Sequence, residues 1–253
     1  MRFTLLLITA TALAQPSRPT FDVLSFKHVG DFQSNIVREE GRTRNNMRPF
    51  QFTPASVSCR VLLRNILMEA YQLKTYQIQA PEWAQTEVYE INGRMTDGTS
   101  RETAQLMLRS ALEDRLGMKA RLEDKEISIF RLVVVPGSDK LQKADTDRQS
   151  MIRIGGNAFG GPAIPIAILA NGLTQAAGRP VIDETGRAGL YKLELHWEPA
   201  PMTPGDGDGG SLRLGTDPGI LSAIKDFGLK LEPAKKSMPF LTIDKINKEP
   251  TEN

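Results

Sequence analysis

Hydrophobic residues recur at helical spacing in four segments of the chain. Apolar positions at i, i+3, i+4 and i+7 predict amphipathic helices. Residues that favour helix ends flank these segments, such as Ser100 before the second and Gly178 after the third. We therefore predict helices near residues 58–72, 100–115, 165–177 and 218–227.

Each predicted helix precedes two segments with strand patterns, in which β-branched and alternating apolar residues predominate. A charged or proline-containing stretch separates the two strands of each pair, including predicted turns at 123–126 and 232–239. The order helix–strand–strand therefore repeats four times, and it predicts an α+β fold with helices packed on antiparallel sheets. The predicted strand pairs lie near 76–80 and 86–95, 118–122 and 127–135, 180–182 and 191–197, and 229–231 and 240–246.

Two further strands are predicted before the first helix, at residues 21–29 and 49–53. The polar stretch 30–48 between them is predicted to be a mobile loop or a long hairpin tip. Glycine-, proline- and charge-rich composition marks linkers at 140–162 and 199–216. The first of these divides the chain into halves. The predicted organisation is a signal peptide at 1–14, a first α+β half at 15–140, a linker at 141–162 and a second α+β half at 163–253.

The amino-terminal segment has the pattern of an export signal. Arg2 precedes a short apolar core, and Ala12-Leu13-Ala14 supplies a cleavage site of the small-x-small type. We expect cleavage after Ala14 and a mature protein that is periplasmic or extracellular. We expect no transmembrane segment in the mature chain, because no apolar run reaches the roughly 20 residues that span a bilayer.

The composition excludes several functional classes. The chain of 253 residues has 32 Lys and Arg against 30 Asp and Glu, so its formal net charge is +2. This balance argues against nucleic-acid binding, which needs a basic face. One cysteine and two histidines exclude a cysteine-based zinc cluster and argue against a multi-histidine metal site. We therefore expect no metal and no cofactor.

Three polar residues are the first candidates for chemistry: Cys59, Asp183 and His196. Cys59 falls on the apolar stripe of the first predicted helix, which favours a buried core position over a nucleophile or an intermolecular disulfide. Asp183 begins Asp-Glu-Thr-Gly, which resembles the Asp-Thr-Gly of aspartic proteases. The inserted Glu and the lack of a second copy favour a turn. His28 and His196 are the only histidine bases available to a hydrolase.

Two glycine-rich stretches are predicted to be loops. The stretch 155–161 lacks the Lys-Ser/Thr of a phosphate-binding loop. Asp206-Gly207-Asp208-Gly209 lacks the later bidentate Glu of a calcium loop.

Aromatic residues offer the best candidate for a binding surface. Tyr71, Tyr76 and Trp83 follow the first predicted helix, and Trp197 ends a predicted strand. These side chains either line a groove for a peptide or ligand, or seal the hairpin onto the helix. We favour the sealing role.

The chain resembles a large family of secreted proteins of unknown function that is abundant in soil bacteria. The resemblance rests on five blocks: FDVLSFK at 21–27, the AY…PEW…YEING stretch at 70–93, and the segments 107–134, 178–197 and 227–253. It implies secretion, and a domain that also occurs appended to zinc-peptidase receptors resembling β-lactam sensors. It implies no catalytic residues. The order of elements is also similar to that of the short amino-terminal domains of secretins and TonB-dependent receptors.

These observations predict an exported, non-catalytic binding or protein-interaction module whose partner is a cell-envelope protein or peptide. Exposed strand edges suit the addition of a partner strand. The alternative is a secreted hydrolase with an unrecognised site, in which Asp183, His196 and Cys59 are the residues to test first.

Overall fold

A computed structural model of the protein describes residues 18–39, 42–155, 158–196 and 218–251. The fold is of the α+β class. Contacts divide the chain into two compact units: unit 1 comprises residues 1–123 and 239–253, and unit 2 comprises residues 124–238. In the described ranges, no helix has the length and apolar character needed to cross a membrane.

Unit 1 is built on an antiparallel sheet with strand order β1-β7-β5-β4. Alternate residues of these strands are buried against the helices, whereas the other face carries polar side chains such as Lys27, Ser58 and Glu90, which is typical of an antiparallel sheet with one solvated face. The strands are β1 (Val23–Asp31), β4 (Arg48–Thr53), β5 (Ser56–Leu62) and β7 (Glu87–Arg94).

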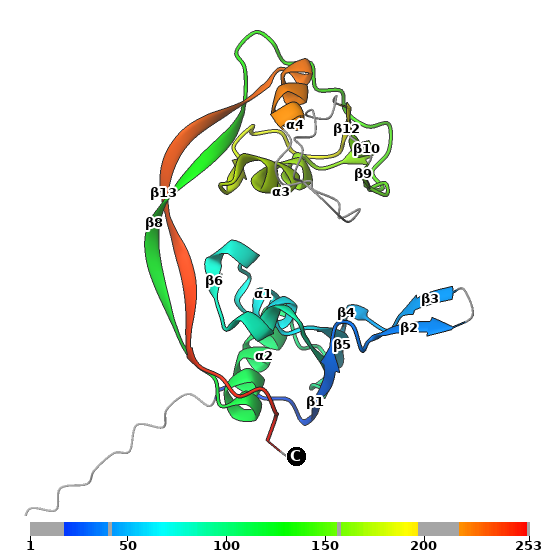
Figure 1. The fold of residues 1–253 in the computed structure, drawn as a ribbon, viewed down its shortest axis with the longest axis vertical. Helices are drawn as coiled ribbons and strands as arrows, with labels where there is room; N and C mark the ends of the chain where they lie inside the picture. The colour runs from blue at the N-terminus through cyan, green and yellow to red at the C-terminus, as the bar shows by residue number, and fades with distance from the viewer. Residues whose placement is uncertain (1–17, 40–41, 156–157, 197–217, 252–253) are drawn as a thin grey trace, which may run out of the picture. The chain divides into compact units, whose positions relative to one another are not determined.

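Two helices cover the buried face of this sheet, as Figure 1 shows for α1 (Leu63–Tyr71) and α2 (Arg101–Leu116). The side chain of Ser100 accepts a hydrogen bond from the Thr103 amide, and Gly117 ends α2 in the left-handed conformation. The apolar stripes of both helices join the sheet residues in one core. Its helical members are Leu63, Ile66, Leu67, Ala70, Leu108, Ala111, Leu112 and Leu116.

Short elements complete unit 1. The polar stretch after β1 forms a two-stranded hairpin of β2 (Ile36–Glu39) and β3 (Arg42–Asn45), in agreement with the predicted hairpin tip. A 3₁₀ turn η1 (Thr75–Gln77), the two-residue strand β6 (Ile78–Gln79) and a second turn η2 (Glu82–Gln85) connect α1 to β7.

Unit 2 has its own core around α3 (Ile166–Ala177). A three-stranded sheet of order β12-β10-β9 packs one face on α3, where Phe159, Leu193 and Leu195 are buried. The strands are β9 (Arg153–Gly155), β10 (Ala158–Ile164) and β12 (Tyr191–His196). Along β12, buried and exposed residues alternate, as its sequence predicts. The unit also contains β11 (Val181–Asp183), α4 (Pro218–Ala223) and the 3₁₀ turn η3 (Ile224–Phe227).

Two long strands replace two of the predicted hairpins. Strand β8 runs without interruption over Lys119–Val134, and β13 runs over Leu229–Lys245, so the turns predicted at 123–126 and 232–239 are wrong. They are neighbours in a sheet of order β11-β8-β13-β6. Charged residues that resemble a turn in the sequence pair across these strands, as Lys235 Nζ does with Glu126 Oε1 at 2.9 Å. Since α2 and α4–η3 are each followed by one long strand, the structure does not reproduce four helix–hairpin copies.

Cys59 lies in β5 and not on a helix, which begins only at Leu63. The buried positions Val57, Cys59 and Val61 alternate along β5, where β-branched residues favour an extended backbone. Cys59 is spaced as in a helix from Leu62 and Leu63 only because the alternating apolar residues of β5 are followed directly by the apolar stripe of α1. The expected burial of Cys59 is confirmed.

The segment 141–162 is not simply a linker, because it contains β9 and the beginning of β10. The described glycines of this segment, Gly155, Gly160 and Gly161, are strand residues, and Gly160 pairs with Arg153 on one side and Glu194 on the other. The compact units assign residues 124–140 to unit 2 and the carboxyl-terminal 239–253 to unit 1, in place of a division at this segment.

Candidate functional site

A groove of about 340 Å³ lies on the face of the β12-β10-β9 sheet that is turned away from α3. Residues paired directly across neighbouring strands project to the same face. The pairs Arg153↔Gly160↔Glu194 and Ala158↔His196 therefore place three polar side chains beside two very small residues. The groove exists because, opposite Arg153, Glu194 and His196, the central strand contributes only the very small residues Gly160 and Ala158.

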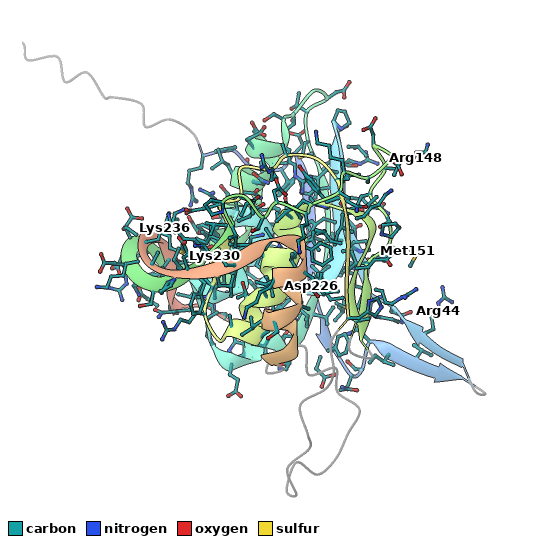
Figure 2. All side chains as sticks on the ribbon, turned by 90° about the horizontal axis from the view of Figure 1, so that it is seen from above. Arg44, Arg148, Met151, Asp226, Lys230 and Lys236 are labelled. Carbon is teal, nitrogen blue, oxygen red and sulfur yellow. The ribbon has the colours of Figure 1, made fainter. Side chains whose placement is uncertain are left out.

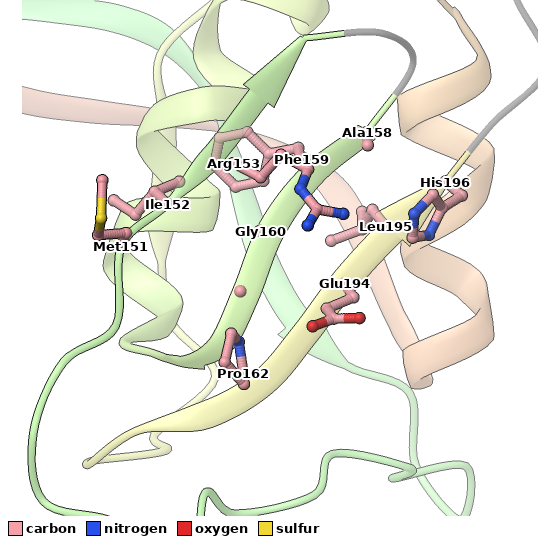
Figure 3. A pocket seen from close by; sticks show the side chains of 11 residues that line it. Met151, Ile152, Arg153, Ala158, Phe159, Gly160, Pro162, Glu194, Leu195 and His196 are labelled. Carbon is pink, nitrogen blue, oxygen red and sulfur yellow. The ribbon is translucent and has the colours of Figure 1, made fainter.

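Figure 3 shows the arrangement of these side chains. Glu194 and His196 project from β12 on the groove side, and the guanidinium of Arg153 reaches over β10 from the opposite strand. The rest of the wall is apolar and includes Met151 and Pro162. Met151 is 94% exposed and stands out from the surface of the unit (Figure 2).

The floor of the groove does not tolerate a side chain at Gly160. Its backbone has φ +131°, a conformation that L-residues rarely adopt, and a β-carbon there would overlap the carbonyl oxygen of Leu193. Glycine in a strand interior often marks a site that another backbone approaches closely. Here the approaching backbone is that of β12 at Leu193, and Gly160 itself is buried between the two outer strands.

The three residues selected from the sequence for testing do not assemble into a catalytic group. His196 lines the groove, but its side chain, like those of Arg153 and Glu194, has no hydrogen-bond or ion-pair partner among the described residues. Asp183 ends β11 and accepts hydrogen bonds from the amide and hydroxyl of Thr185, at 3.0 and 2.7 Å. Gly186 has φ +66°. This is the turn that the sequence favours over a protease motif.

Cys59 belongs to the core of unit 1, where burial raises the pKa of its thiol to about 12. A nucleophilic cysteine requires a lowered pKa and access to solvent. Neither condition is met at Cys59.

The aromatic candidates have packing partners in unit 1. Tyr71 and Trp83 pack against the core, and the guanidinium of Arg109 lies 4.6 Å from the Tyr71 ring centroid. Tyr76 lies in η1 and is partly exposed. Trp197, like the 206–209 stretch, lies outside the described residues. Tyr71 and Trp83 thus contribute to the packing of unit 1, and a sealing role remains a prediction.

Sequence reasoning missed Arg153 and Glu194. The alternation along 191–196 already puts Glu194 on the polar face with His196. The glycines around Arg153, however, suggest a flexible segment, so nothing in the sequence aligns this side chain with β12. In the part of the chain that the structure describes, no group of three His, Cys, Asp or Glu side chains is placed to hold a metal ion.

The comparisons with known proteins place the chain in a family without indicating a function. No curated protein and no solved structure matches it. A family model described as "protein of unknown function (DUF3738)" matches residues 64–246, which include α2, all but the first residue of α1 and the whole groove of unit 2. The chain belongs to this DUF3738 family of proteins of unknown function.

Proposed function

We propose that the protein is an exported, non-catalytic binding module that takes an extended segment of a cell-envelope polypeptide in the groove of unit 2. The observation that carries this proposal is the groove itself, which lies beside the edge strand β9 and has Gly160 in its floor. An extended chain added beside β9 gains main-chain hydrogen bonds, and its alternate side chains lie on the groove face next to Arg153.

The edge position of β9 supports this mode of binding. It ends the strand order β12-β10-β9, so no described strand pairs with its outer side. Unpaired strand edges are templates for another strand unless the fold protects them. At the opposite edge, residues 142–144 bond to the backbone of β12, for example Lys192 N to Gln142 O at 2.9 Å. Strand β9 is therefore the better docking edge of this sheet.

The charges of the groove favour a polypeptide over a purely apolar ligand. Arg153 lies on one wall and Glu194 on the other, with apolar side chains such as Met151 between solvent and the floor. A segment docked at β9 complements Arg153 with an acidic side chain, and a long basic side chain directed across the groove complements Glu194. Apolar residues between them would cover Met151 and Pro162.

Three features support a role without catalysis. The groove contains a base, His196, but no described carboxylate orients it and no described nucleophile adjoins it. A nucleophile and base within hydrogen-bonding reach, with a third group orienting the base, are the signature of covalent catalysis. Asp183 is engaged in its turn and Cys59 is in the core.

The proposal that the protein is exported rests on the sequence of residues 1–14, and amino-terminal sequencing tests it. Protein recovered from the envelope or the medium of a producing cell should begin at Gln15. Protein retained in the cytoplasm with Met1 intact would contradict export.

Binding in the groove is tested with a random-peptide library selected on the purified protein. Met151→Asp and Arg153→Glu should each weaken the selected peptides about tenfold, because anchor residues at the centre of an interface typically contribute 1 kcal/mol or more. Leu122→Asp is the matched control, since Leu122 is also an exposed hydrophobic residue but lies in unit 1. Equal affinity for the groove variants and the control would place the peptide elsewhere.

A further inference from the structure

Both nitrogens of His28 face carboxylate groups. His28 projects from β1, and its Nε2 lies 2.6 Å from Glu87 Oε2, at the first residue of β7. On the other side of the ring, Nδ1 lies 2.8 Å from Glu249 Oε1, which belongs to the carboxyl-terminal segment. The side chains of His28 and Glu87 are 13% and 9% exposed, whereas that of Glu249 is 74% exposed.

Two contacts of this kind require two protons on the ring. An ionised carboxylate only accepts hydrogen bonds, and a neutral imidazole has a single N–H. The Oε1 atom of Glu87 lies 2.7 Å from Lys248 Nζ, which only donates. Burial raises the pKa of Glu87, but hydrogen bonds from Lys248 and His28 outweigh it, so the pKa is lowered overall. Glu87 is therefore ionised, and Glu249 is open to water.

The other titratable and charged groups near Glu87 and Lys248 come from three segments of unit 1. Strand β1 contributes Asp31, whose pKa is lowered by hydrogen bonds from the Ser34 backbone and side chain and which also interacts with the charge of Lys248. Strand β7 contributes Glu87 and Tyr89. Burial raises the pKa of Tyr89, so its hydroxyl stays protonated and donates to the Lys248 carbonyl at 2.7 Å. The carboxyl-terminal segment contributes Lys248 and Glu249. Three acidic groups thus surround one lysine.

The carboxyl-terminal segment is attached to unit 1 on both sides of this cluster. The Asn247 amide donates to the Leu116 carbonyl, and the Thr251 amide donates to the Arg115 carbonyl, each at 2.8 Å. Between them, Glu249 reaches back to His28. This link joins residues 221 positions apart and connects the end of the chain to the first strand.

We propose that His28, Glu87 and Glu249 form a proton-binding site that attaches the carboxyl-terminal segment to the sheet of unit 1; we call this attachment the clasp. With two protons on its ring, His28 donates to both carboxylates. When one proton leaves, a bare nitrogen faces a carboxylate. Glu249 then turns into solvent, because it is the exposed partner and Glu87 is also held by Lys248. Attachment of the segment at Glu249 therefore depends on pH.

The protonation state of His28 is measured by ¹⁵N NMR of the ring nitrogens in the full-length protein. The chain has only two histidines, so the variant His196→Asn assigns the His28 signals directly. At neutral pH both ring nitrogens of His28 should carry protons. Glu249→Gln should give a neutral ring under the same conditions, because a glutamine amide can donate to Nδ1. A neutral, single-tautomer ring in the unsubstituted protein would overturn the proposal.

Hydrogen exchange tests the clasp itself. Protection factors of the Asn247 and Thr251 amides, corrected for intrinsic rates, should fall about three- to tenfold as the pH is raised through the loss of the second ring proton. Glu249→Gln should show no such step, and Glu113→Gln serves as a control on an exposed glutamate of α2. The same step in Glu249→Gln, or none in the unsubstituted protein, would contradict a clasp closed by a proton.

Discussion

Replacing Leu108 by alanine should lower the free energy of unfolding of unit 1 by about 2–5 kcal/mol. Leu108 lies at the middle of α2, is fully buried, and packs in the core between the helices and the sheet. The substitution removes buried methyl groups and leaves a cavity in this core, whose other members belong to elements held in place by their own backbone hydrogen bonds. Urea denaturation followed by circular dichroism measures the loss.

Leu106 provides the control on the same helix. It is two residues from Leu108 but points away from the core and is 42% exposed. Leu106→Ala keeps the helix propensity change of the first substitution while removing little buried surface, so it should alter stability by about 0.5 kcal/mol or less. Equal losses in the two variants would mean that α2 does not present the Leu108 face to the sheet.

Local pattern predicts most of the helices and the shorter strands of this protein. The segment 101–116 has a capping serine, an apolar stripe and a glycine stop, and all three act as expected. Cys59 shows where local pattern fails, because the apolar residues of β5 run directly into those of α1. Pairing with β4 and with β7, which is distant in sequence, holds residues 56–62 in an extended strand.

The long strands and the groove depend on contacts that sequence periodicity does not record. Residues 123–126 are all charged and mostly exposed, so they resemble a turn, and they are held extended in β8 by its neighbour β13. Arg153 and Glu194 converge only through the register of β9 and β12 on β10. His28 could be placed on a strand from sequence, but Glu87 and Glu249 are 59 and 221 residues away.

Replacing Gly228 by alanine should destabilise unit 2 more than an ordinary glycine substitution. Gly228 follows η3 with φ +72°, a left-handed conformation that costs an L-residue roughly 1–2 kcal/mol. It is also buried, and a β-carbon there would overlap the carbonyl oxygen of Ser138. The backbone cannot move away freely, because the Val135 amide donates to the Gly228 carbonyl at 2.7 Å and the Lys140 amide donates to that of Phe227.

Gly178→Ala separates the two contributions to this loss. Gly178 follows α3 in the same unit with φ +62°, but nothing lies within 4 Å of its β-carbon position. Both variants therefore carry the cost of the left-handed backbone and the same gain from a stiffer unfolded chain. Only Gly228→Ala adds the overlap with Ser138, which we expect to cost a further 1–3 kcal/mol or so in the free energy of unfolding. If thermal unfolding gave the same loss for both variants, the close contact between the end of η3 and residues 135–140 would be absent in solution.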